Sequence, residues 1–222
     1  GWAGFNCSLP HKVSVIEHLD GLGASAAIIG AVNCVVAREG RLVGENTDGQ
    51  GFVASLRTVV DPRDRTLVVL GAGGAARAVA VEAAFAGVAR ITIVNRDPRR
   101  GAALAALVED RTPARASFVA WDGPYRVPLA TDILVNATSV GLGDADAMPA
   151  VDTSTLRTHM VVADVIPNPS RTRLLRCAEL HGCRTLDGQG MLVAQAAIAI
   201  EHWTGVRADT GVMRRELSRV GA

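Results

Sequence analysis

Residues 66–76 decide the fold, and they read Thr66-Leu67-Val68-Val69-Leu70-Gly71-Ala72-Gly73-Gly74-Ala75-Ala76. The largely apolar start is typical of a strand that is buried on both faces of a parallel sheet. A G-x-G-x-x-A turn follows, and then an alanine-rich helix is predicted at residues 75–86. The first glycine permits the tight turn, the second lets a pyrophosphate approach the backbone, and the last small residue lets the helix pack closely on the strand. The stretch therefore predicts a dinucleotide site with phosphates at the helix N-terminus; the alternative is an ordinary glycine turn.

Strands and helices alternate downstream of this turn. Strands are predicted at residues 91–94, 117–119, 132–136, 161–165 and 184–186, and helices at residues 99–107, 171–181 and 191–202. The alternation predicts a Rossmann-type α/β domain, a doubly wound parallel sheet, over residues 61–187. Residues 1–57 and 190–222 do not fit the repeat. We expect them to pack together as a smaller α/β substrate domain, with residues 190–222 as its C-terminal helices.

Residues 1–57 carry signals of their own. Pro10 is expected to open a helix that continues to Leu19, because proline is favoured in a first helical turn. The chain opens mid-pattern on Gly1, so we expect the substrate domain to lack an N-terminal part. Turn and strand patterns further predict a strand at residues 30–36, a turn at Glu39-Gly40, a returning strand at residues 41–44 and a helix at residues 50–60.

The composition excludes several classes of protein. The 222 residues are 49% apolar and 20% charged, which rules out a disordered chain. The 23 Lys and Arg against 22 Asp and Glu leave a net charge of +1, so no basic field serves nucleic acid or a membrane surface. The four cysteines form no CxxC pair, which is typical of reduced thiols in a cytoplasmic protein without a metal site. The expected partner is a small molecule, and the expected assembly is a monomer or a homodimer.

The end of the second predicted strand of the Rossmann unit bears on the choice of cofactor. An NAD enzyme places a carboxylate here for the ribose 2′-hydroxyl, whereas this chain has Arg96, followed by Arg99 and Arg100. A guanidinium cluster suits a 2′-phosphate, which favours NADP. Asp97 weakens that argument and keeps NAD possible, since its carboxylate could repel the phosphate or hold a ribose. The alternative is a solvated loop with helix-capping charges.

A series of motifs runs along the whole chain. The motifs are Gly4-Phe5-Asn6-Cys7-Ser8-Leu9-Pro10-His11-Lys12, Gly30-Ala31-Val32-Asn33, Asn46-Thr47-Asp48-Gly49, Gly71-Ala72-Gly73-Gly74-Ala75, Asn95-Arg96, Asn136-Ala137-Thr138-Ser139-Val140-Gly141, Asn168-Pro169 and Gly188-Gln189-Gly190-Met191-Leu192-Val193-Ala194-Gln195-Ala196-Ala197. In order and spacing, this series resembles shikimate dehydrogenase. The resemblance implies an NADP-dependent oxidoreductase acting on a CH–OH group, which reduces 3-dehydroshikimate to shikimate in aromatic amino-acid biosynthesis. The alternatives are a quinate/shikimate dehydrogenase that uses NAD and a non-catalytic NADP-binding module.

The resemblance also implies the residues of the site. Lys12 and Asp48 correspond to the catalytic pair, and Ser8, Asn33 and Gln195 join them in binding the substrate. No metal site is implied. Cofactor contacts are expected from Gly71, Ala72, Gly73, Gly74, Ala75, Asn95, Arg96, Arg100, Val165 and Gly188.

The chemistry of ketone reduction agrees with the Lys–Asp pair. Hydride arrival develops negative charge on the ketone oxygen, so the site needs an acid or a cation there. With Lys12 about one turn into the helix opened by Pro10, the positive helix end should disfavour its charged form, while Asp48 should oppose that shift and fix the ammonium. The alternatives are a surface lysine and a turn-forming aspartate before Gly49. Gln195 lies on an otherwise apolar helix and needs a partner if buried, which a substrate hydroxyl would provide.

The chain departs from the family pattern at three places. Pro167 stands where the family has a tyrosine that contacts the substrate, and Asp97 stands where a small hydroxyl residue often follows Asn-Arg. The upstream Ser-x-Ser motif that holds the substrate carboxylate in the family is absent from this sequence. We therefore expect the chain to bind NADP, to reduce dehydroshikimate poorly, and to be rescued by an upstream segment.

Overall fold

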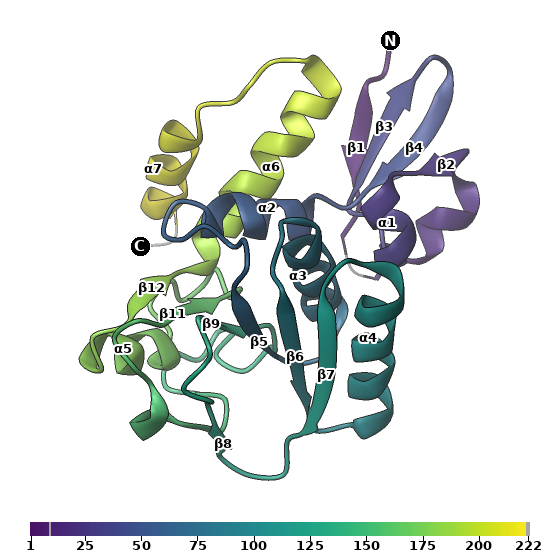
Figure 1. The fold of residues 1–222 in the computed structure, drawn as a ribbon. Helices are drawn as coiled ribbons and strands as arrows, with labels where there is room; N and C mark the ends of the chain where they lie inside the picture. The colour runs from purple at the N-terminus through teal and green to yellow at the C-terminus, as the bar shows by residue number, and fades with distance from the viewer. Residues whose placement is uncertain (9, 221–222) are drawn as a thin grey trace.

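The computed structural model describes residues 1–8 and 10–220, and Figure 1 shows two main sheets with a helix, α2, between them. The larger sheet has six parallel strands in the order β12-β11-β9-β5-β6-β7. The smaller sheet has four strands in the order β1-β3-β4-β2, and β8 (Tyr125–Arg126) pairs with β10 (Val151–Asp152) separately. Leu9, part of the expected N-terminal motif, and residues 221–222, part of the expected C-terminal segment, lie outside the described residues.

The larger sheet grows in two directions from β5. The chain runs from β5 to β6 and β7 on one side, and then crosses to β9, β11 and β12 on the other. This is the doubly wound Rossmann order, so the predicted fold class is confirmed. Its strands are β5 (Thr66–Leu70), β6 (Arg90–Asn95), β7 (Arg115–Ala120), β9 (Ile133–Asn136), β11 (Val161–Asp164) and β12 (Arg184–Leu186), and its helices are α3 (Gly74–Phe85), α4 (Pro98–Arg111) and α5 (Arg173–Leu180).

Alternate residues of β5 point into two different cores, because successive side chains of a strand face opposite sides of the sheet. Leu67 and Val69 pack in one cluster with the alanines of α3. Val68 and Leu70 pack in the other cluster with the leucines of α5. Both faces of the strand are therefore covered by helices, as its continuous apolar run predicts.

The smaller sheet is built around a hairpin of β3 (Cys34–Arg38) and β4 (Arg41–Glu45). Glu39 and Gly40 have φ values of 51° and 77°, the left-handed pair of a tight two-residue turn, which confirms the predicted turn. The helix α1 (Ala24–Ile29), which was not predicted, packs Ala26 against this sheet. The remaining strands are β1 (Gly4–Asn6), antiparallel to β3, and β2 (Gly21–Leu22), parallel to β4.

The helix predicted to open at Pro10 is wrong. The chain makes a turn at residues 10–13 and then a short 3-10 helix, η1 (Ser14–His18). A competing hydrogen bond is the reason: the carbonyl oxygen of Lys12 accepts from Val32 N at 2.8 Å, so it does not accept the helical bond from Ile16 N. Lys12 precedes η1, and the expected effect of a positive helix end on its charge does not apply.

Helix α2 (Thr47–Leu56) connects the two sheets and packs against both α3 and α6 (Gly188–Thr204). A Cβ atom at Gly49 would lie 2.4 Å from the Ala78 carbonyl oxygen of α3. Only a glycine therefore lets α2 approach the Rossmann unit this closely. The last element is α7 (Thr210–Val220). Within the described ranges, no helix combines the length and apolar character that crossing a bilayer requires.

Candidate active site

Lys12 and Asp48 form an ion pair where the two sheets meet. The Nζ atom of Lys12 lies 2.6 Å from Oδ2 of Asp48, and the side chains are 26% and 22% exposed. Asp48 stands in the first turn of α2, where the helix dipole favours a carboxylate. Asn46 begins that helix as its N-cap and accepts a hydrogen bond from Gly49 N. The structure therefore brings together the two residues that were expected to be catalytic.

Asn33 holds the second oxygen of Asp48. Its Nδ2 donates to Oδ1 of Asp48 at 2.9 Å and to Oγ1 of Thr47 at 2.9 Å, while its Oδ1 accepts from Thr47 N at 2.7 Å. Asn33 is buried immediately before β3, so its amide is held firmly. Because both carboxylate oxygens are bonded, the orientation of Asp48 toward Lys12 is fixed before a substrate arrives.

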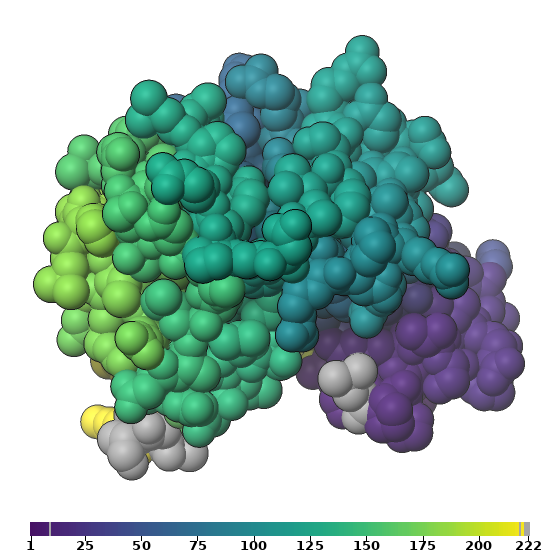
Figure 2. Space-filling view, turned by 90° about the horizontal axis from the view of Figure 1, so that it is seen from below, coloured from purple at the N-terminus to yellow at the C-terminus, as the bar shows by residue number. Residues whose placement is uncertain are grey.

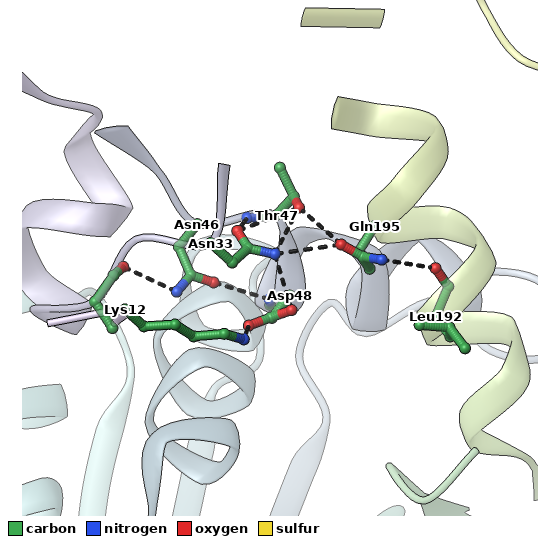
Figure 3. Close-up of polar contacts among 9 residues, drawn as sticks. Lys12, Asn33, Asn46, Thr47, Asp48, Leu192 and Gln195 are labelled. Atoms are coloured by element: carbon green, nitrogen blue, oxygen red, sulfur yellow. Dashed lines mark hydrogen bonds and ion pairs between the residues drawn. The ribbon is translucent and has the colours of Figure 1, made fainter. Parts of the chain in front are cut away.

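Gln195 reaches the same cluster from α6. Its Oε1 accepts from Asn33 at 3.3 Å and from the Thr47 hydroxyl at 3.4 Å, and its Nε2 donates to the Leu192 carbonyl oxygen. The close approach depends on Gly51 of α2, where a Cβ would lie 2.7 Å from Gln195 N. Figure 3 shows Lys12, Asn33, Asp48 and Gln195 converging from four separate segments of the chain.

The glycine turn presents bare backbone at the start of α3. Gly71 has a φ of +106°, a conformation that favours glycine, and a Cβ there would make a tight contact of 3.1 Å with the Ala137 carbonyl oxygen. Gly73 and Gly74 face open space instead, and the N-cap Gly73 supplies no side-chain cap. The first amides of α3 are therefore left to an external acceptor, and the first turn has no acidic residue to repel an anion. This arrangement fits the phosphates of a dinucleotide.

Two more expected cofactor residues lie where β11 meets α6. Val165 follows β11 directly, and Gly188 is the first residue of α6. A Cβ at Gly188 would lie 2.3 Å from the Ile166 carbonyl oxygen, so the glycine allows α6 to begin against this backbone. The close contact of Gly188 with the Ile166 backbone thus positions α6, the helix that carries Gln195.

One cavity of about 530 Å³ joins the two halves of the site, a volume within the range of small-molecule pockets. It lies between the N-terminal unit and the Rossmann unit, and Figure 2 shows a notch between the purple N-terminal residues and the neighbouring green residues. Four polar residues line the cavity: Lys12, Asn46, Asp48 and Gln195. The other lining residues are Ala31, Gly74, Ala75, Leu142, Val165, Pro167, Gly188, Met191 and Leu192.

Arg96 and Arg100 lie beyond this cavity, after β6 and at the start of α4. Both side chains are exposed, and neither makes a hydrogen bond or ion pair with another described residue. Asp97 is engaged instead, because its Oδ1 caps α4 by accepting from Arg99 N at 2.9 Å and Arg100 N at 3.2 Å. Asn95 donates to the Asp97 carbonyl oxygen at 2.8 Å. Among the described residues, the guanidinium groups of Arg96, Arg99 and Arg100 therefore have no partner, while the carboxylate of Asp97 is occupied with its own helix.

Ser8 is not brought to the cluster. It lies in a separate cavity of about 400 Å³ with Phe5, His11 and His18, and its side chain makes no hydrogen bond within the described part of the chain.

Two residues of the site were not predicted from the sequence: Asn46, which donates to the Ala31 carbonyl oxygen, and Thr47, whose backbone N donates to Asn33. The signal was present, since an Asn or Thr before a helix is an N-cap pattern.

Lys12 is also distinguished by composition. It is the only lysine among the 23 basic residues of the chain, and the other 22 are arginines. Arginine does not release its proton in proteins, whereas the lysine amine can lose and regain one. The single lysine thus stands at the one position of the cavity where proton transfer is expected. Among the described residues, the other ion pairs are formed by arginines, apart from the pair of His18 with Glu17.

The fold and the site together are those of a dinucleotide-dependent oxidoreductase, in which a Rossmann turn and a Lys–Asp pair face one cavity. Family models agree with this class. The model of the shikimate dehydrogenase substrate binding domain matches residues 1–35, and that of the shikimate 5′-dehydrogenase C-terminal domain matches residues 188–217.

Individual relatives extend the match to nearly the whole chain. Shikimate dehydrogenase (NADP(+)) of Symbiobacterium thermophilum is 47% identical over 96% of this chain and 74% of its own length. The structure of 5-ketofructose reductase of Gluconobacter sp. strain CHM43 is 56% identical with a TM-score of 0.97, over 99% of this chain and 79% of that one. The structure of quinate dehydrogenase from Corynebacterium glutamicum in complex with NAD is 34% identical with a TM-score of 0.89, over 99% of this chain and 78% of that one. The chain belongs to the shikimate dehydrogenase family of NADP-dependent oxidoreductases that act on a CH–OH group.

Proposed function

We propose that the protein reduces 3-dehydroshikimate to shikimate with NADPH, and catalyses the reverse reaction, as a shikimate dehydrogenase. The observation that carries this proposal is the single cavity that is lined both by the Lys12–Asp48 pair and by the N-terminal residues of α3. A non-catalytic NADP-binding module would have no need for a buried network that fixes a Lys–Asp pair. The cofactor would be held by the backbone of residues 71–75, with Arg96 and Arg100 on the 2′-phosphate.

The residues of the cavity divide the remaining work. NADPH supplies the hydride when it is bound, and the protein must meet the negative charge that develops on the ketone oxygen. Lys12 Nζ holds a proton at that oxygen and donates it, while Asp48 keeps the ammonium in place at 2.6 Å. Asn33, which is buried outside the cavity lining, orients Asp48, while Gln195 lines the cavity and offers hydrogen bonds to ring hydroxyls. Leu142, Val165 and Met191 limit the access of water.

A second candidate substrate is a keto sugar of the 5-ketofructose type. Two observations favour it: the high identity to the 5-ketofructose reductase, and Pro167 in the cavity wall where the family pattern has a tyrosine hydroxyl. Such a substrate is neutral. It needs hydroxyl partners, which the cluster provides, and no carboxylate-binding site.

A substrate panel separates these possibilities. The oxidation of NADPH and of NADH by the purified chain is measured with 3-dehydroshikimate, 3-dehydroquinate and 5-ketofructose. We expect the highest kcat/KM with 3-dehydroshikimate and NADPH. The highest kcat/KM with 5-ketofructose would favour the second candidate substrate. The highest kcat/KM with 3-dehydroquinate and NADH would favour a quinate dehydrogenase. A chain that binds NADPH and turns over none of the three would contradict catalysis.

We further propose that the enzyme acts in the cytoplasm, as a monomer or a homodimer. In support, all four cysteines are free thiols, and burial raises the pKa of Cys34 to about 11, so that this thiol stays protonated at neutral pH. We assign residues 61–187 to the cofactor and residues 1–57 with 190–222 to the substrate. Light scattering after gel filtration measures the oligomeric state.

A further inference from the structure

A buried carboxylate lies outside the proposed chemistry, at the end of β11. Asp164 is 2% exposed, and both of its oxygens are bonded. Its Oδ1 accepts from Asn136 Nδ2 at 3.1 Å and from Ile166 N at 3.1 Å. Its Oδ2 accepts from the Thr172 hydroxyl at 2.8 Å and from Asn136 Nδ2 at 3.2 Å. All these partners are uncharged, so the carboxylate is buried without a neutralising cation, an arrangement that costs stability.

The partners of Asp164 organise two neighbouring loops. Asn136, the last residue of β9, accepts from Thr138 N and from the Thr138 hydroxyl at 3.1 and 2.7 Å, and donates to the Val140 carbonyl oxygen. Ile166 lies in the loop after β11, and Thr172 ends that loop as the N-cap of α5. One carboxylate therefore ties the ends of two adjacent strands and the loops that leave them.

These loops occupy the second half of the Rossmann sheet. A dinucleotide lies across the carboxyl ends of the strands at the point where the strand order reverses, which is beside β5. The half formed by β5, β6 and β7 carries the glycine turn and Arg96. The half formed by β9, β11 and β12 is left for the other mononucleotide. Leu142, Val165 and Pro167 from its two loops line the cavity that holds Lys12.

We propose that Asp164 is a positioning residue for the nicotinamide half of the cofactor, acting through Asn136, Ile166 and Thr172. The proposal rests on the proposed function, since it assumes that NADPH binds across this sheet edge. Asp164 touches neither the cavity nor the reacting atoms. It fixes the two loops so that the hydride donor lies at a constant distance from the Lys12–Asp48 pair.

The test compares the two halves of the cofactor. Asp164→Leu removes all acceptors at similar volume, and Asp164→Asn keeps one acceptor oxygen. Asp132→Asn serves as the matched control, because Asp132 bonds Thr66 N and Arg65 at the opposite end of the same sheet. For each variant we measure kcat and KM, the fluorescence of bound NADPH, and the affinity for adenosine 2′,5′-bisphosphate by calorimetry.

We expect Asp164→Leu to lower kcat by roughly 10–100-fold, because a misplacement of about 1 Å can cost that much. Bound NADPH should change its fluorescence, while affinity for the bisphosphate stays unchanged. Asp164→Asn should recover part of kcat, and Asp132→Asn should behave as the wild type. Unchanged kcat and fluorescence in Asp164→Leu would overturn the proposal, as would a parallel loss of bisphosphate affinity. If Asp164→Leu does not fold, the same readouts on Asp164→Asn decide.

A failure of the proposed function can be distinguished from a failure of the proposal for Asp164. If the wild type binds NADPH but reduces none of the three ketones, catalysis is contradicted. The fluorescence of bound NADPH and the affinity for adenosine 2′,5′-bisphosphate would then still test the role of Asp164. If the wild type does not bind NADPH at all, both proposals are overturned.

Discussion

The glycine turn before α3 and the Lys12–Asp48 cluster face the same cavity but are built in opposite ways. The turn consists of backbone from one continuous stretch, with Gly71 in a left-handed conformation and free amides at Gly73 and Gly74. The cluster consists of side chains from segments far apart in the sequence, and the bond from Asn33 to Gln195 spans 162 residues. The turn depends on local conformation, whereas the cluster depends on how α2 packs against its neighbours. Changes at the cluster should therefore affect chemistry, and changes at α2 packing should affect the cluster.

The largest effect is expected at the cluster. Lys12→Ala removes the proposed proton donor and should lower kcat by roughly 10²–10⁴-fold, the range for a positioned acid or base. NADPH affinity should not change, because the glycine turn lies on the other half of the site. Steady-state kinetics with calorimetry of NADPH binding measure both. Near-normal turnover by the variant would remove Lys12 from the mechanism.

The next effect concerns stability on the Rossmann side. Burial raises the pKa of Asp164 to about 6, above its ordinary value of 3.8. The folded state then binds a proton more tightly than the unfolded chain, so the free energy of unfolding falls as the pH rises from about 4 to 6 and levels off above that. A shift of this size corresponds to about 3 kcal/mol.

Urea unfolding between pH 4 and 7 measures this dependence in the wild type and in Asp164→Asn. The variant has no titrating group at this position, so its curve should lack that fall. Parallel curves for the two proteins would show that Asp164 does not titrate in this window.

A smaller effect is expected from the packing of α2. Gly51→Ala places a Cβ against the backbone of Gln195, and overpacking of about 1–3 kcal/mol should exceed the helix-propensity gain of about 1 kcal/mol. Stability and kcat should fall together, because the clash moves Gln195. Gly123→Ala is the control, since its Cβ would meet open space. Equal melting curves for the two variants would contradict the packing argument.

The smallest effect concerns the choice of cofactor. Arg96→Ala should raise the KM for NADPH about tenfold, as expected for the loss of a charge-assisted hydrogen bond, and leave the KM for NADH unchanged. Arg111→Ala, at the far end of α4, is the control. An equal effect on both cofactors, or none, would mean that Arg96 does not read the 2′-phosphate.

Some features that depend on local sequence were predicted correctly, whereas some that depend on packing between distant segments were missed. The strands β5 and β12 match their predicted residues, because their patterns depend only on burial in a parallel sheet. The Pro10 helix failed because a distant amide, Val32 N, took the carbonyl oxygen of Lys12, and no local pattern contains that bond. Asp164 was missed as a functional candidate for a similar reason, since its partners Asn136 and Thr172 meet only in the folded sheet.

The site was predictable in part. Resemblance of motifs led to Lys12, Asn33, Asp48 and Gln195, and the structure brings these four together. Ser8 came from the same motif as Lys12 yet lies in a separate cavity with Phe5 and His11, so a shared motif does not place both residues at one site. Motifs therefore identified the residue types, and packing decided which of them meet.

The most direct test of the central claim, that Lys12 gives up a proton, is the kcat of Lys12→Arg. The guanidinium keeps the positive charge and can pair with Asp48, but it does not release a proton in proteins. We expect kcat to fall by about 10²-fold or more, as for a lost general acid, with NADPH affinity unchanged. A Lys12→Arg variant that retains most of its turnover would show that charge alone suffices, and it would contradict proton transfer from Lys12.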